Sequence, residues 1–167
     1  MVTVVRRLSM VGLVVTSLFI GEPIRAQNEP CSTTSGSSIL VKIIGLKHRA
    51  GTVRIRLFGG DPNTYFDKRY TLNRIEFAVP KNGDIEHCIA VPRAGTYAVD
   101  VRHDANRNGK TDRADGAGAS GNPDVSLLDV IFKKMPPVSK VQITVGRGST
   151  VATIIIKYLS GGKLRPG

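Results

Sequence analysis

Residues 52–58 read Thr-Val-Arg-Ile-Arg-Leu-Phe, and this stretch decides the fold. Its apolar residues at 53, 55 and 57 alternate with Arg54 and Arg56. Successive side chains of an extended chain point to opposite faces, so a period of two indicates a strand with one buried face. The pattern therefore predicts a strand that covers a core on one side and presents two arginines on the other.

Similar strand signals, bounded by Gly and Pro, recur along the chain. The predicted strands are residues 38–46, 52–58, 74–79, 85–91, 96–102, 139–145 and 150–159. Gly146-Arg147-Gly148 separates the last two and predicts a hairpin between them. Asp61-Pro62 predicts at most one helical turn, and no longer helical period is present in the sequence. We therefore expect an all-β fold, an antiparallel Greek-key β-sandwich of about seven strands with transthyretin- or Ig-like character.

The beginning of the chain has the pattern of an export signal. Two arginines precede a mostly apolar run over residues 8–20, which is shorter than the roughly 20 apolar residues that a membrane-spanning helix needs. Ala26 offers a small residue for cleavage before Gln27. These features predict a Sec-type signal peptide over residues 1–26 and a periplasmic or secreted mature chain without a transmembrane segment. Pro23 and the polar residues after it disfavour the alternative, an uncleaved N-terminal anchor.

Composition divides the rest of the chain. We expect a flexible leader over residues 27–38, a β-sandwich domain over residues 39–159 and a flexible tail over residues 160–167. Cys31 and Cys88 are the only cysteines, and disulfides persist in an exported protein. The sequence therefore predicts a Cys31–Cys88 bridge that ties the leader to a strand, the alternative being a buried free Cys88.

A loop rich in Asp and Asn over residues 104–115 has the spacing of an EF-hand-type calcium loop, with Gly109 at its sixth position. The candidate metal ligands are Asp104, Asn106, Asn108, the Lys110 carbonyl, Asp112 and Asp115. The predicted cofactor is Ca²⁺ with weak affinity, because three basic residues interleave with the carboxylates and the last position is Asp rather than Glu. The alternative is an ion-free turn that satisfies its own backbone through Asx hydrogen bonds.

The charge balance points to anionic partners. The chain has 24 Lys+Arg against 13 Asp+Glu, a formal net charge of +11. We expect anionic cell-envelope polymers or lipid head groups as partners, or simply a solvated cationic exterior. The basic residues are dispersed and lack interleaved aromatics, which argues against specific nucleic-acid binding. The three histidines are not at zinc-ligand spacing, and His103 is either a strand-end residue or an auxiliary group beside the Asp/Asn loop.

Several segments together resemble one bacterial family. They are residues 51–58 (GTVRIRLF), 92–99 (PRAGTYAV), 103–110 (HDANRNGK) and 115–118 (DGAG), the last followed by Asn122-Pro123. Over residues 39–159 the chain resembles the DUF2141 family of small secreted bacterial proteins. The resemblance implies a prealbumin- or transthyretin-like β-sandwich and brings no established activity. The chain departs from the family over residues 125–137, which are unusually apolar.

Three functions are compatible with these features. The first is an exported non-enzymatic module with the calcium-type loop and a structural or adhesive role at the cell envelope. The second is a binding module for an anionic or carbohydrate ligand. The third is an unrecognised hydrolase, although no G-x-S-x-G, HExxH, CxxC or P-loop motif occurs. The hydrolases found among transthyretin-like proteins end in Tyr-Arg-Gly-Ser, whereas this chain ends in Leu-Arg-Pro-Gly.

Overall fold

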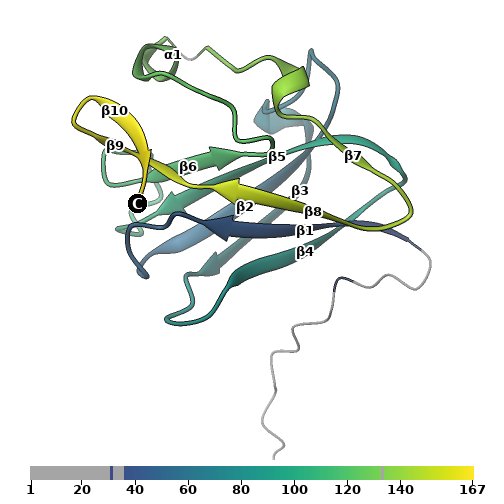
Figure 1. Cartoon of the computed structure of the whole chain (residues 1–167), viewed down its shortest axis with the longest axis horizontal. Helices are drawn as coiled ribbons and strands as arrows, with labels where there is room; N and C mark the ends of the chain where they lie inside the picture. The colour runs from purple at the N-terminus through teal and green to yellow at the C-terminus, as the bar shows by residue number, and fades with distance from the viewer. Residues whose placement is uncertain (1–30, 32–35, 133) are drawn as a thin grey trace, which may run out of the picture.

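The computed structural model describes residue 31 and residues 36–132 and 134–167. Within these residues the chain forms ten strands, one α-helix and two short 3-10 turns. The strands lie in two sheets packed face to face, and the predicted all-β sandwich is confirmed (Figure 1). The strands are more numerous than the roughly seven that a sandwich of this kind suggests.

The smaller sheet has the strand order β4-β1-β8. Its members are β1 (Ser37–Ile44), β4 (Ile85–Val91) and β8 (Gly148–Ile155). β1 pairs with β4 in the antiparallel sense but with β8 in the parallel sense, so the sandwich is not purely antiparallel. The parallel pair forms because β8 enters this sheet from the other one rather than by a hairpin turn.

The larger sheet has the strand order β10-β9-β6-β5-β2-β3, with β7 paired to β5. Its members are β2 (Thr52–Gly59), β3 (Thr71–Ala78), β5 (Gly95–Asp104), β6 (Gly116–Ala119), β7 (Ile143–Val145), β9 (Lys157–Ser160) and β10 (Lys163–Pro166). The 3-10 turns are η1 (Lys68–Tyr70) and η2 (Val138–Lys140), and the helix is α1 (Leu127–Ile131). Ile156 alone separates β8 from β9, so the chain passes from one sheet to the other within a single extended stretch.

Three elements differ from the sequence-based expectation. The prediction of a hairpin at residues 146–148 is wrong, because β7 pairs in the larger sheet and β8 pairs in the smaller one. Residues 160–167, expected as a tail, contribute β10, which pairs with β9. The sequence gives no strand signal for β6, because two of its four residues are glycines. Gly116 and Gly118 lie so close to residues 154–158 that an added Cβ would collide with them.

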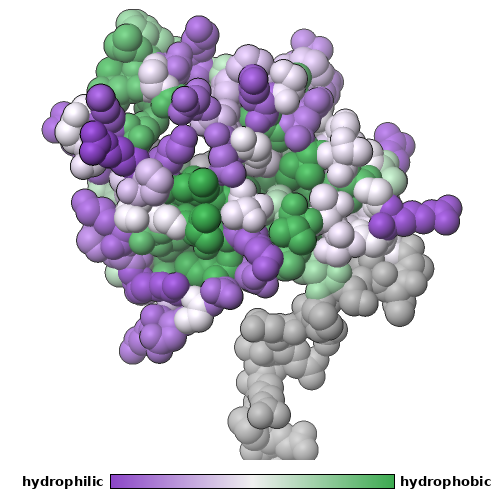
Figure 2. Space-filling view, in the orientation of Figure 1, coloured by the Kyte–Doolittle hydropathy of each residue, from purple (hydrophilic) through white to green (hydrophobic). Residues whose placement is uncertain are grey.

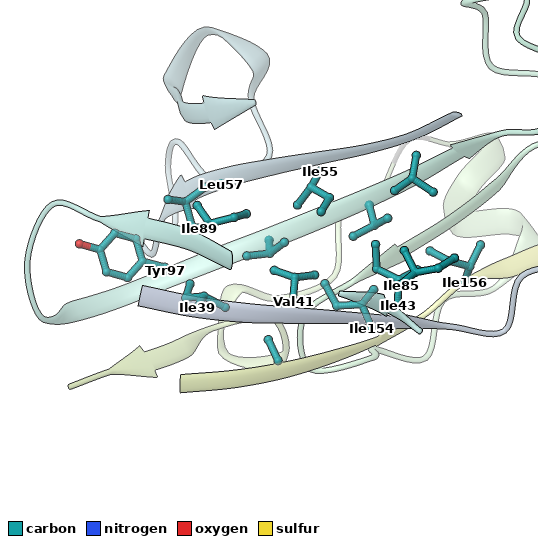
Figure 3. Close-up of a cluster of buried hydrophobic side chains, with 14 of the residues drawn as sticks. Ile39, Val41, Ile43, Ile55, Leu57, Ile85, Ile89, Tyr97, Ile154 and Ile156 are labelled. Atoms are coloured by element: carbon teal, nitrogen blue, oxygen red, sulfur yellow. The ribbon is translucent and has the colours of Figure 1, made fainter. Parts of the chain in front are cut away.

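The core lies between the two sheets and follows the period of two. Figure 3 shows Ile39, Val41 and Ile43 of β1 facing Ile55 and Leu57 of β2, with Ile154 and Ile156 alongside. Val53, Ile55 and Leu57 are all buried, as the alternation in residues 52–58 predicts. Arg54 and Arg56 consequently lie on the opposite face of the larger sheet, where the candidate site is found.

The predicted signal peptide and most of the leader lie outside the described residues. No helix in the described part of the chain is long and apolar enough to cross a membrane.

A disulfide joins Cys31 to Cys88 of β4, with their Cα atoms 5.3 Å apart. The pairing predicted from the two cysteines is therefore present in the structure. The bridge spans 57 residues of sequence and attaches the segment before β1 to an edge strand of the smaller sheet.

We predict that replacing both cysteines by serine lowers the free energy of unfolding by about 2–4 kcal/mol, because the cross-link restricts the unfolded chain. Urea unfolding of the double variant beside the oxidised parent measures the loss, and the reduced parent should match the variant. Intact mass before and after reduction and alkylation gives the thiol count. Two free thiols in protein isolated from the periplasm would contradict the prediction.

Candidate functional site

The outer face of the larger sheet consists of two different halves. The strand register aligns one row of side chains as Glu76, Arg54, Arg102, Ala117 and Lys157, and the adjacent row as Arg74, Arg56, Asp100 and Ala119. The part on β3, β2 and β5 is charged, and we call it the charged half. The part on β6, β9 and β10 carries Ala117, Ala119, Leu159 and Leu164, and we call it the apolar half.

Two ion pairs hold the charged half, one in its middle and one at its edge. Arg56 binds Asp100 through both carboxylate oxygens, with a distance of 2.9 Å from Nε to Oδ1, and its guanidinium also lies 5.2 Å from the centre of the Phe58 ring. Burial raises the pKa of Asp100, and the bond from Arg56 opposes that effect. At the edge, Arg74 binds Glu76 at 2.8 Å, and this bond lowers the pKa of the glutamate.

Arg102 gathers three of the six predicted calcium ligands. Its Nη2 lies 3.1 Å from Oδ2 of Asp104 and 3.2 Å from Oδ2 of Asp115, and it also donates to the Lys110 carbonyl. Only 8% and 2% of the Asp104 and Asp115 side chains are exposed. A guanidinium from the chain itself therefore neutralises the first and last carboxylates of the loop.

The other three predicted ligands form a second group. Asp112 accepts hydrogen bonds from the side-chain amides of Asn106 (2.8 Å) and Asn108 (2.6 Å) and from the Ala114 N–H (2.8 Å). These bonds lower the pKa of Asp112, so their contribution to stability is present above its ordinary pKa and is lost as the pH falls through the lowered value. The amide oxygens of Asn106 and Asn108 accept backbone N–H groups two residues further along the chain.

The loop oxygens are thus engaged within the chain. A calcium ion at Asp104 and Asp115 would meet the positive charge of Arg102 at the oxygens that it needs, so this donor set does not fit Ca²⁺ while Arg102 stays in place. Among the residues described, no group of three or more His, Cys, Asp or Glu side chains is arranged to hold a metal ion. Calcium binding stays a prediction, and the stability experiment below tests it.

A cavity of about 350 Å³ lies over the apolar half. Residues 120–132 and 134–137, which we call the strap, supply its roof, and α1 is held away from the sheets at the top of the view in Figure 1. The floor includes Ala117, Ala119 and Leu159, and the roof includes Val125, Leu127 and Val130. Phe66 and Pro136 close one side, while Asp100, Asp112, Arg113, Asp115 and Lys157 also contribute to the lining.

Hydrogen bonds anchor the strap at both ends. At its start, Asn122 donates to the Thr153 carbonyl (2.9 Å) and accepts from the Ile155 N–H (2.8 Å). At its end, the Tyr65 hydroxyl donates to the Pro136 carbonyl. In between, Ser126 and Asp129 form a capping box that starts α1, and its bonds lower the pKa of Asp129.

The strap is apolar on its outer side as well. The exposed fractions of Leu128, Ile131 and Phe132 are 63%, 59% and 76%, and apolar surface gathers over α1 in Figure 2. Exposed apolar clusters of this kind mark places where a protein meets a ligand or another surface. The unusually apolar run over residues 125–137 was the one sequence signal for this part of the site. No sequence signal pointed to the alanines of the cavity floor.

His103 belongs to the core rather than to the loop. Its ring is fully buried, with Nδ1 2.5 Å from the Tyr158 hydroxyl and Nε2 2.6 Å from the Ala50 carbonyl. The Tyr158 hydroxyl in turn accepts the Lys47 N–H at 3.3 Å. These contacts assign the proton to Nε2 and let Nδ1 accept from the hydroxyl, so the histidine ties β5 to β9.

The fold and this face define a small all-β sandwich with an Asx-rich loop and a strap-covered outer sheet. A family model described as "Uncharacterized protein conserved in bacteria (DUF2141)" matches residues 41–153, more than half of the chain, so the chain belongs to the DUF2141 family. The resemblance drawn from the sequence is confirmed. No curated protein and no solved structure matches the chain.

We predict that Asp104→Ala lowers the free energy of unfolding by about 2–4 kcal/mol with or without Ca²⁺, because it removes one carboxylate from the Arg102 guanidinium, whose side chain is only 13% exposed. Asp112→Ala, which leaves the Arg102 pairs intact on an exposed part of the loop, should cost less. Urea unfolding in millimolar Ca²⁺ and in chelator measures both variants. Stabilisation of the parent by Ca²⁺ that Asp104→Ala abolishes would instead establish calcium binding.

Proposed function

We propose that this protein is an exported, non-enzymatic binding module that holds the apolar part of a small ligand beneath the strap. The cavity carries the proposal, because it has an apolar floor and an apolar roof and its volume of about 350 Å³ lies at the lower end of the range for small-molecule sites. Of the three functions considered from the sequence, this proposal is closest to the second, a binding module for an anionic or carbohydrate ligand. It differs in that the ligand also has an apolar part.

The way the strap is built supports this proposal. Its anchors at Asn122 and Tyr65 are polar, whereas the segment between them presents Val125, Leu127 and Val130 to the cavity. Filling a cavity with apolar atoms recovers dispersion contacts that its lining otherwise lacks. A ligand that enters here therefore gains binding energy from contact with both the strap and the sheet.

The carboxylates beside the cavity support a binding role over a catalytic one. Asp100 is held by Arg56, Asp115 by Arg102, and Asp112 by the amides of Asn106 and Asn108. A general base or nucleophile needs an oxygen that reaches the substrate. These oxygens are already committed to donors of the protein, so they shape the edge of the cavity.

The structural or adhesive function has less support. It depended on a calcium-type loop, and in this loop Arg102 takes the place of a cation between Asp104 and Asp115. Export to the periplasm or the exterior stays part of the proposal, resting on the signal-peptide pattern of residues 1–26.

We predict saturable binding of an uncharged apolar fluorophore, N-phenyl-1-naphthylamine, by the mature protein, seen as a rise in its emission. Ala119→Phe places a ring on the floor of the cavity and should weaken binding by at least about tenfold, since it occupies the apolar space. The matched control is Ala90→Phe, at an exposed position of β4 outside the cavity lining, which should bind as the parent does. Equal binding by the two variants, or none by the parent, would contradict the proposed function.

A further inference from the structure

Arg54 occupies the centre of the charged half without a partner of its own. The register places it between Glu76 of β3 and Arg102 of β5. Glu76 bonds Arg74 at 2.8 Å and Thr52 at 3.4 Å instead, and Arg102 turns to the Asp/Asn loop. In the part of the chain that the structure describes, Arg54 forms no ion pair, and its buried Nε, like that of Arg102, has no hydrogen-bond acceptor.

The carboxylates of this face are unevenly shared among its four arginines. Asp100 pairs with Arg56 and Glu76 pairs with Arg74, while Arg102 pairs with both Asp104 and Asp115. The result is a local excess of positive charge at Arg54. Burial lowers the pKa of Arg54, the neighbouring positive charges of Arg102, Arg56 and Arg74 lower it further, and the Asp100 carboxylate opposes them.

An unpaired charge in such a place needs a counter-charge. Arg54 is half-buried with its Nε shielded from solvent, and like charges directly opposite each other in a sheet repel, as Arg54 and Arg102 do. A guanidinium offers a planar fork of N–H donors that matches the oxygens of a carboxylate or a phosphate. The missing partner is therefore an oxyanion from outside the chain.

We propose that Arg54 binds the oxyanion head, a carboxylate or a phosphate, of the same ligand whose apolar part lies beneath the strap. This inference rests on the proposed function and names its ligand class, an anionic amphiphile. Ala117 on the cavity floor lies in the same register row as Arg54, two strands away, which is about 10 Å at the usual strand spacing. A head at Arg54 and a short alkyl chain over β6 fit that separation.

The test compares decanoate with 1-decanol, which share a ten-carbon chain and differ in the head group, by calorimetry at pH 7.5 and low salt. Decanoate should bind at least about tenfold more tightly, because only its head forms charge-assisted hydrogen bonds. In Arg54→Gln the affinity for decanoate should fall to that for decanol, while decanol binding stays within about twofold of the parent. Arg54→Lys, which keeps a charge but loses the fork, should give an intermediate affinity for decanoate.

Arg147→Gln, at an exposed position between β7 and β8, removes the same charge elsewhere and should leave both affinities unchanged. Urea unfolding confirms that each variant is folded. Equal affinities of the parent for the two probes would overturn the oxyanion head and leave the cavity proposal standing. So would an equal loss in the Arg54 and Arg147 variants, which indicates long-range attraction alone.

Inorganic phosphate separates the two parts of the inference. If the parent binds neither decanol nor decanoate, the proposed function fails together with the amphiphile. Saturable phosphate binding that Arg54→Gln abolishes would then still support an oxyanion site at Arg54, for a free anion rather than a lipid-like one. Absence of phosphate binding in that case would overturn the oxyanion site too.

Discussion

The period of two along β2 and β5 is the constraint on which the rest of the structure depends. Side chains at odd positions of these strands meet β1 and β8 in the core, and this apolar contact holds the two sheets together. The same pleat directs Arg54, Arg56, Asp100 and Arg102 to the outer face. A shift of one residue in this register would bury the charges and expose the core, so the stability of the sandwich also positions the candidate site.

On the outer face, Arg102 changes what the calcium-type loop over residues 104–115 can bind. The spacing of the loop over residues 104–115 is that of a calcium loop, but spacing does not show which cation the oxygens meet. Arg102 projects from β5 to the ends of the loop and bonds Asp104, Asp115 and the Lys110 carbonyl. Arg54 on the adjacent strand faces Arg102 in the register and forms no ion pair in the described part of the chain.

The strap and the charged half together favour a ligand with two kinds of surface. The strap supplies apolar contact above β6, and Arg54 supplies an unmatched positive charge two strands away. An adhesive or purely structural module needs neither feature. A binding module for an anionic amphiphile uses both, and it agrees with the export signal predicted from the sequence and with the positive charge of the chain.

The sequence alone determined the features that a local pattern or a residue count can specify. The alternation in residues 52–58 predicted β2 and its buried face, the presence of only two cysteines behind a predicted export signal predicted the Cys31–Cys88 bridge, and the motifs predicted the family. Only the tertiary structure decided the rest, because it depends on contacts between distant residues. The passage of β8 into β9, the strand over Gly116 and Gly118, the meeting of Arg102 with Asp115 and the isolation of Arg54 all follow from strand order and register, which no local pattern encodes.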